Sequence, residues 1–133
     1  MQTFLEFSTK TNSSIGLDRS AMPQIREEDI PDFLNFVRQK NIQVKKSTMK
    51  ISELLPTQNE VNPERIVAKV QKAGKVKPFI ISSDNYILDG HHQLYALKYI
   101  DPKTAVTVYK VSVPMKEFIN IAKSYPRVSY KSL

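Results

Sequence analysis

The residues best suited to chemistry in this chain are its only two histidines, His91 and His92, which stand side by side. They follow an Asp-Gly pair in the stretch ILDGHHQLYALK, where an apolar run meets a helix-like run. Gly90 allows the backbone to adopt a positive φ or to approach a ligand closely. The first N–H groups of a helix have no intrahelical acceptors, and together with the helix dipole they favour an anion. The pattern therefore indicates a phosphate site to which two imidazoles donate hydrogen bonds.

Asp89, directly before this glycine, can serve such a site in two ways. Its carboxylate can hold a Mg²⁺ ion, or it can orient a histidine through a hydrogen bond. A structural alternative requires no ligand, because the histidines can instead cap the helix and pack. The adjacent pair after an Asp-Gly turn, in a basic chain, favours the functional interpretation.

Composition excludes several other kinds of chemistry. The chain has 133 residues, which is enough for one domain with a single core. It has no cysteine, which excludes disulfides and thiol catalysis, and two histidines argue against an all-protein zinc site. No apolar run approaches the ~20 residues of a membrane helix, and the N-terminus lacks the pattern of a secretory signal. We therefore expect a cytoplasmic protein with no membrane partner.

The net charge of +7 is concentrated in the middle of the chain. Residues 1–37 hold three basic and six acidic residues, residues 38–77 hold ten and three, and residues 78–133 hold seven and four. A basic middle segment favours a nucleic acid or a nucleotide's phosphates as partner, although such lysines can also form a solvated surface. On the helix expected in this segment, Arg65, Lys69 and Lys72 share a face, which predicts weak, sequence-independent nucleic-acid binding.

Periodicity and capping residues predict the elements that position these groups. Helices are expected at residues 29–41, 63–74, 91–100 and 114–125. Strands are expected at residues 42–51, 79–82, 86–88 and 105–113, and residues 52–62 have the composition of a loop. This order predicts an α+β or mixed α/β arrangement around a small sheet. One domain is expected at residues 27–126, between an arm at 1–26 and a tail at 127–133.

Two sequence blocks together resemble the ParB/sulfiredoxin superfamily. KPFIISSDNYILDGHHQLYALK is similar to the family's strand pair, glycine-containing turn and helix, where many stand-alone members have Asp-Gly-His-His-Arg. ISELLPTQNEVNPERIVAKVQKAGKVKPFII resembles the family's proline/asparagine loop, helix and following strand. The blocks cover residues 51–98, and LDRSAMPQI and LLPTQNEVN further resemble small phage-encoded members. The resemblance implies a small mixed sheet with flanking helices, and host cytoplasm as the location if the protein is phage-encoded.

The same resemblance implies a site for ATP or another nucleotide, usually bound with Mg²⁺. Gly90, His91 and His92 fall on the phosphate-binding turn, and Asp89 is the candidate metal ligand. Sulfiredoxin's reactive cysteine falls at His91, which excludes sulfinic-acid reduction. The family's usual arginine falls at Gln93, whose amide can donate to a phosphate oxygen but brings no charge. Lys77, with Lys75 or Arg65, is the candidate source of the missing charge.

The proline/asparagine loop faces the turn in relatives, and in the free-serine kinase branch one of its polar residues acts in catalysis. The corresponding candidates are Gln58, Asn59, Glu60 and Asn62. Glu60 is the only carboxylate among them and can act as a general base, with His91 and His92 binding or polarising the phosphate. The alternative is that Glu60 is a solvated loop charge.

Two functions remain open from the sequence. The first is Mg²⁺-dependent phosphoryl transfer or phosphate-ester hydrolysis, as in ATPase-like, kinase-like or nuclease-like relatives. The second is a non-catalytic module that binds DNA without sequence specificity. The Asp-Gly-His-His pair favours the first, and the glutamine at position 93 favours the second. A dimer is possible in either case.

Overall fold

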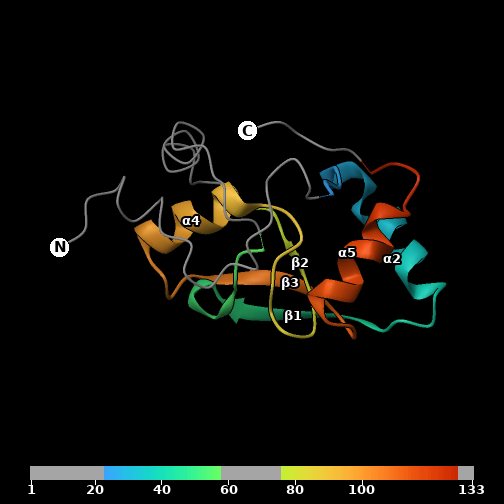
Figure 1. Ribbon diagram of the computed structural model, residues 1–133. Coiled ribbons are helices and arrows are strands. Elements are labelled where there is room, and N and C mark those ends of the chain that lie inside the picture. Colours follow the sequence, from blue (N-terminus) through green and yellow to red (C-terminus); the bar gives the residue numbers. More distant parts are fainter. Residues whose placement is uncertain (1–22, 58–75, 129–133) are drawn as a thin grey trace.

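A mixed three-stranded sheet forms the centre of the fold (Figure 1). The computed structural model describes residues 23–57 and 76–128. Strand β1 (Val44–Lys50) pairs antiparallel with β3 (Ala105–Val111), and β3 pairs in parallel with β2 (Phe79–Ile81), giving the order β1-β3-β2. The parallel pair is possible because helix α4 (His91–Ile100) carries the chain back between β2 and β3. The expected α+β class with a small mixed sheet is confirmed.

The apolar core lies on both sides of the sheet. Val106 and Val108 of β3 pack with Leu94 and Leu97 of α4 on one face. At the other end of the sheet, Val111 joins a second cluster formed largely by helices α2 (Ile30–Arg38) and α5 (Met115–Lys123). Figure 1 shows α2 and α5 side by side at this end, away from α4. The periodic apolar residues of each helix therefore face the sheet or each other, as amphipathic helices require.

Helix α2 is held to the C-terminal segment by aromatic contacts. The rings of Phe33 and Tyr125 meet edge to face at 5.1 Å between centroids. The Tyr125 hydroxyl donates a 2.6 Å hydrogen bond to the carboxylate of Asp32. Burial and this hydrogen bond to Asp32 raise the pKa of Tyr125 to about 12.

Several boundaries differ from those expected from sequence. The first helix is preceded by a 3₁₀ turn, η2 (Glu27–Asp29), and a second one, η3 (Ile51–Glu53), follows β1. The expected strand at residues 86–88 forms only isolated bridges, Leu55 with Tyr86 and Ile81 with Ile87. The helix expected at 63–74 lies outside the described residues. No helix in the two described ranges is long and apolar enough to cross a membrane.

Candidate phosphate-binding turn

Gly90 is the N-cap of α4 and has a φ of 91°, in the left-handed region that glycine favours. A Cβ at this position would lie 3.1 Å from Cε1 of Phe79, a side chain that is fully buried. The N–H of Gly90 donates a 2.7 Å hydrogen bond to Oδ1 of Asp89. The sharp turn expected at Asp89-Gly90 is therefore present, and both its φ and its close packing against Phe79 favour glycine.

Both histidines lie in the first turn of α4 and are buried, with exposed fractions of 3% for His91 and 8% for His92. Nε2 of His91 accepts a 2.9 Å hydrogen bond from the backbone N–H of Thr57. The Thr57 hydroxyl lies 2.8 Å from the same nitrogen and donates to the carbonyl of Ile87, also at 2.8 Å. Since an acceptor nitrogen carries no proton, neutral His91 is protonated on Nδ1. Nε2 thus connects the loop to the turn, and Nδ1 carries the proton of the ring.

Gln93 makes a two-way hydrogen bond with the backbone of Lys77. Its Oε1 accepts from the Lys77 N–H, and its Nε2 donates to the Lys77 carbonyl, both at 3.0 Å. The side chain therefore pairs with both backbone groups of Lys77 and joins α4 to the segment just before β2. The structure brings these two predicted binding residues together, and Lys77 itself is exposed.

Asp89 is partly buried beside the turn. The described parts of the chain contain no group of three or more His, Cys, Asp or Glu residues that could hold a metal ion. Mg²⁺ is nevertheless often bound through one or two carboxylates together with substrate phosphates and water. Among the described residues, the ligand set expected for a stand-alone metal site is therefore not found, and Asp89 stays the predicted ligand of a Mg²⁺ ion that is bound together with a nucleotide.

Glu60, Arg65 and Lys75 lie outside the described residues, as do Gln58, Asn59 and Asn62. The described part of their loop ends at Thr57, whose bond to His91 places it against the turn. This contact agrees with the expected approach of the loop to the turn. The roles predicted for the site residues are not tested by these contacts and stay predictions.

Two further polar residues of α4, which the sequence did not single out, have pKa values that are shifted by burial. The Tyr95 hydroxyl is buried without a hydrogen-bond partner among the described residues, and burial raises the pKa of Tyr95 to about 12. Burial also lowers the pKa of Lys98. Their spacing from His91, four and seven positions, places all three on one face of the helix. That spacing was the sequence signal that could have identified them.

Comparison with known proteins found no matching family model and no matching curated protein. Among solved structures, the chain is similar to a Pnob8-like ParB-N domain, with 16% identity and a TM-score of 0.48, over 61% of this chain and 35% of that chain. It is also similar to a pNOB8-like ParB N-domain, with 18% identity and a TM-score of 0.45, over 57% and 30%. The chain thus spans about a third of the length of each.

Proposed function

We propose that the turn at residues 89–92 binds the phosphates of a nucleotide with Mg²⁺, and that the chain is a nucleotide-dependent phosphotransferase or hydrolase. The observation that carries this proposal is the geometry of Gly90. Its left-handed φ starts α4 with an N-cap residue that has no side chain to accept the first N–H groups of the helix, and its packing against Phe79 fixes the position of the turn. At α5, by contrast, the carboxylate of Asp84 accepts the N–H of Met115 at the start of the helix.

Each residue of the turn has a defined part in this proposal. His91 donates from Nδ1 to a phosphate oxygen, while its Nε2 keeps Thr57 and the following loop against the turn. His92 donates from the same helical turn. Asp89 supplies one carboxylate ligand to Mg²⁺, and that ion neutralises phosphate charge when bound. Glu60, three positions beyond Thr57 in sequence, is the proposed general base for a hydroxyl or water nucleophile.

The direct test is a thermal-shift screen of ATP, ADP, CTP and GTP, each with and without Mg²⁺. A ligand at 100 times its Kd stabilises a protein by about 2.7 kcal/mol. With an unfolding entropy of roughly 2.1 cal/mol/K per residue, this raises the melting temperature of a 133-residue chain by about 10 °C. We expect at least one triphosphate to produce such a rise with Mg²⁺, and a smaller one without it.

Two variants test whether this rise in melting temperature depends on the turn at residues 89–92. Asp89→Asn keeps an oxygen for the Gly90 N–H but loses the charge, so we expect the Mg²⁺-dependent part of the shift to disappear. His92→Ala should reduce the shift by any nucleotide, whereas Asn120→Ala, on the exposed face of α5, should not. No shift with any nucleotide, or a shift equal in His92→Ala and wild type, would remove the support for this function.

A second candidate, a non-catalytic DNA-binding module, is favoured by the position of Gln93. The Lys77 backbone accepts from one N–H of its amide and donates to its oxygen, so the position that holds an arginine in relatives adds no charge and keeps only one N–H for a phosphate. The two candidates differ in turnover. Phosphate release from a nucleotide that is lost in Glu60→Gln would support the enzyme, whereas nucleotide-independent DNA binding without phosphate release would support the module.

A further inference from the structure

One face of the sheet carries an exposed polar surface on the side opposite α4. The strand register pairs Lys46 with Tyr109, Thr48 with Thr107, and Lys50 with Ala105. Directly paired residues of antiparallel strands project to the same face, so these six side chains form one surface, which we call the open sheet face. Helix α4 packs on the opposite side through the intervening residues of β3. Figure 1 shows α2 and α5 at the Val44 end of the sheet, where the half-buried Tyr109 contacts their cluster, and no described α-helix over the rest of the open sheet face.

The open sheet face is positively charged and has no carboxylate of its own. The chain from Phe33 to Ser52 contains no aspartate or glutamate but holds five cations: Arg38, Lys40, Lys45, Lys46 and Lys50. The ion pairs found among the described residues involve only arginines 26 and 127, so no β1 lysine is paired with a described carboxylate. The first carboxylate after this run, that of Glu53, accepts the backbone N–H of Lys50. The charge of β1 is therefore available to an anionic partner.

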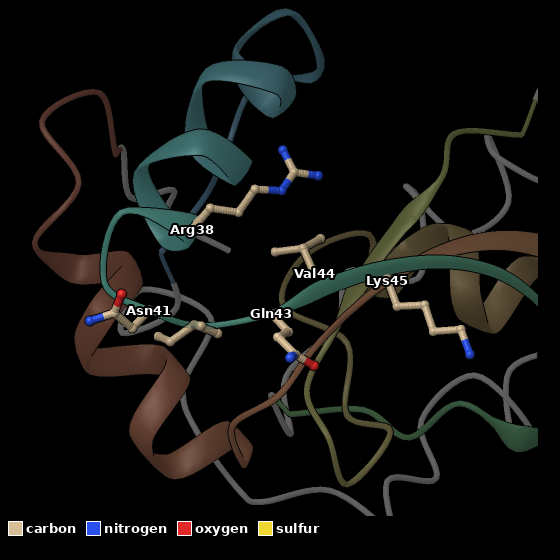
Figure 2. Close-up of a pocket in the computed structure, with 6 residues that line it drawn as sticks. Arg38, Asn41, Gln43, Val44 and Lys45 are labelled. Atoms are coloured by element: carbon tan, nitrogen blue, oxygen red, sulfur yellow. The ribbon is translucent and has the colours of Figure 1, made fainter.

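The positive charge continues around the start of β1 into an open groove of about 570 Å³. Figure 2 shows Arg38 of α2 and Lys45 of β1 on either side of Val44 at this groove. Lys45 alternates with Lys46 along the strand and so points to the opposite face. The cations thus follow the outer edge of the sheet for several residues, which suits an extended polyanion better than a single small anion.

Tyr109 gives the open sheet face a second kind of contact. Its ring is half-buried, and Nζ of Lys46 lies 5.9 Å from the ring centroid. Lysines alone are common on edge strands, where they prevent association with other strands. A tyrosine among them adds a surface on which an unpaired base can stack while the lysines contact phosphates. An acidic peptide would use the lysines but has no need of the ring.

We propose that the open sheet face binds single-stranded nucleic acid, with Lys46 and Lys50 on phosphates and Tyr109 stacked against a base. A single strand suits this face better than a duplex, because its unpaired bases can stack on the tyrosine ring, whereas the bases of a duplex are already stacked on one another. This surface is separate from the turn at residues 89–92 and does not rest on nucleotide binding there.

The test is fluorescence anisotropy with labelled dT20 and a duplex of the same length, from 50 to 200 mM salt. We expect dT20 to bind more tightly than the duplex. The slope of log affinity against log salt is about −0.7 per phosphate contact for single strands. Lys46→Gln/Lys50→Gln should therefore flatten the slope by about 1.4. Lys116→Gln/Lys123→Gln, with the same charge change on the exposed face of α5, should leave it unchanged.

The ring is tested separately from the charge. Tyr109→Leu keeps an apolar side chain against the core and should weaken dT20 binding about tenfold, whereas Tyr109→Phe keeps the ring and should bind like wild type. If Tyr109→Leu does not fold, Tyr109→Met removes the ring in its place and should weaken dT20 binding to the same extent.

Four results would overturn the proposal. The first is no dT20 binding at 50 mM salt. The second is a slope flattened only by Lys69→Gln/Lys72→Gln, which would assign the binding to the helix predicted from sequence. The third is equal affinity for the duplex with no effect of Tyr109→Leu. The last is equal affinity for a polyglutamate peptide with no effect of Tyr109→Leu, which would assign the face to acidic proteins.

Discussion

Restoring the arginine of the resembling family at position 93 should strengthen nucleotide binding and weaken the fold. In the native chain, the Gln93 amide forms two hydrogen bonds with the Lys77 backbone, each of 3.0 Å. A typical hydrogen bond contributes a net ~0.5–1.5 kcal/mol to stability. Gln93 is only half-buried, so water can replace part of this contribution. Removing both bonds in Gln93→Ala should therefore cost about 1–2 kcal/mol.

Gln93→Arg removes one bond and retains the other. A guanidinium can still donate to the Lys77 carbonyl but cannot accept from the Lys77 N–H, so the cost should be about 1 kcal/mol. At roughly 2.1 cal/mol/K of unfolding entropy per residue, this lowers the melting temperature of 133 residues by about 4 °C. A charge-assisted bond to phosphate contributes about 1.5–3 kcal/mol, which corresponds to a gain of tenfold or more in nucleotide affinity.

The assay is thermal unfolding of wild type and three variants, with and without the nucleotide identified by the screen. Gln93→Glu is the matched counterpart of the arginine variant, because it keeps the acceptor for the Lys77 N–H and loses the donor. It should lose stability to a similar extent and bind nucleotide more weakly. An arginine variant as stable as wild type would show that the amide is not held at Lys77. An unchanged nucleotide affinity of that variant would show that position 93 does not face the phosphates.

The remaining predictions concern the glycine, the buried tyrosine and the loop carboxylate. Gly90→Ala places a Cβ 3.1 Å from Phe79 at a φ of 91°, so chemical denaturation should show that the free energy of unfolding falls by about 1–3 kcal/mol. The double variant Gly90→Ala/Phe79→Leu should lose less stability than the sum of the two single variants, because Phe79→Leu relieves the contact. Strict additivity would show that the contact does not affect stability. Tyr95 is favoured in its neutral form, because its pKa of about 12 lies above the ordinary value of 10.0; the stability that depends on the neutral phenol is therefore present below pH 10 and lost as the pH rises toward 12. Tyr95→Phe should reduce this loss of stability at alkaline pH and leave the stability at pH 7 equal or higher. Tyr125→Phe, by contrast, should destabilise the protein at pH 7, because it breaks the hydrogen bond to Asp32. A large loss of stability at pH 7 in Tyr95→Phe would mean that the Tyr95 hydroxyl has a hydrogen-bond partner. Glu60→Gln should lower turnover with little change in nucleotide affinity, and equal turnover would identify Glu60 as a solvated loop charge.

The sequence was most informative where local rules decide the structure. The apolar period of residues 29–41 and 114–125 predicted α2 and α5 to within a few residues, because amphipathic helices bury one face. Asp-Gly before a periodic run predicted the start of α4, since few residues other than glycine adopt its φ.

Long-range partners could not be predicted in the same way. The bond between Thr57 and His91 joins residues that are 34 positions apart, and no local pattern at either residue indicates the other. The parallel pairing of β2 with β3 was equally hidden, because strand propensity gives no partner or direction. From the sequence, Gln93 is only a weak substitute for arginine in phosphate binding. In the structure its two hydrogen bonds to the Lys77 backbone join α4 to the segment before β2, and this contact depends on the tertiary fold.

The register of the sheet has a consequence for how the protein is made. Among residues 23–57 and 76–128, strand β1 pairs only with β3, so the hydrogen bonds between them cannot form until Val111, the partner of Val44, has left the ribosome. The unit from β2 through α4 to β3 is contiguous in sequence and can assemble first, since local contacts form faster than distant ones. During that interval β1 is an unpaired strand, the kind of segment that aggregates in nascent chains. Its three lysines, together with a serine and a threonine, keep the waiting strand hydrated. Charge on this strand therefore protects the nascent chain before it serves any partner of the folded protein.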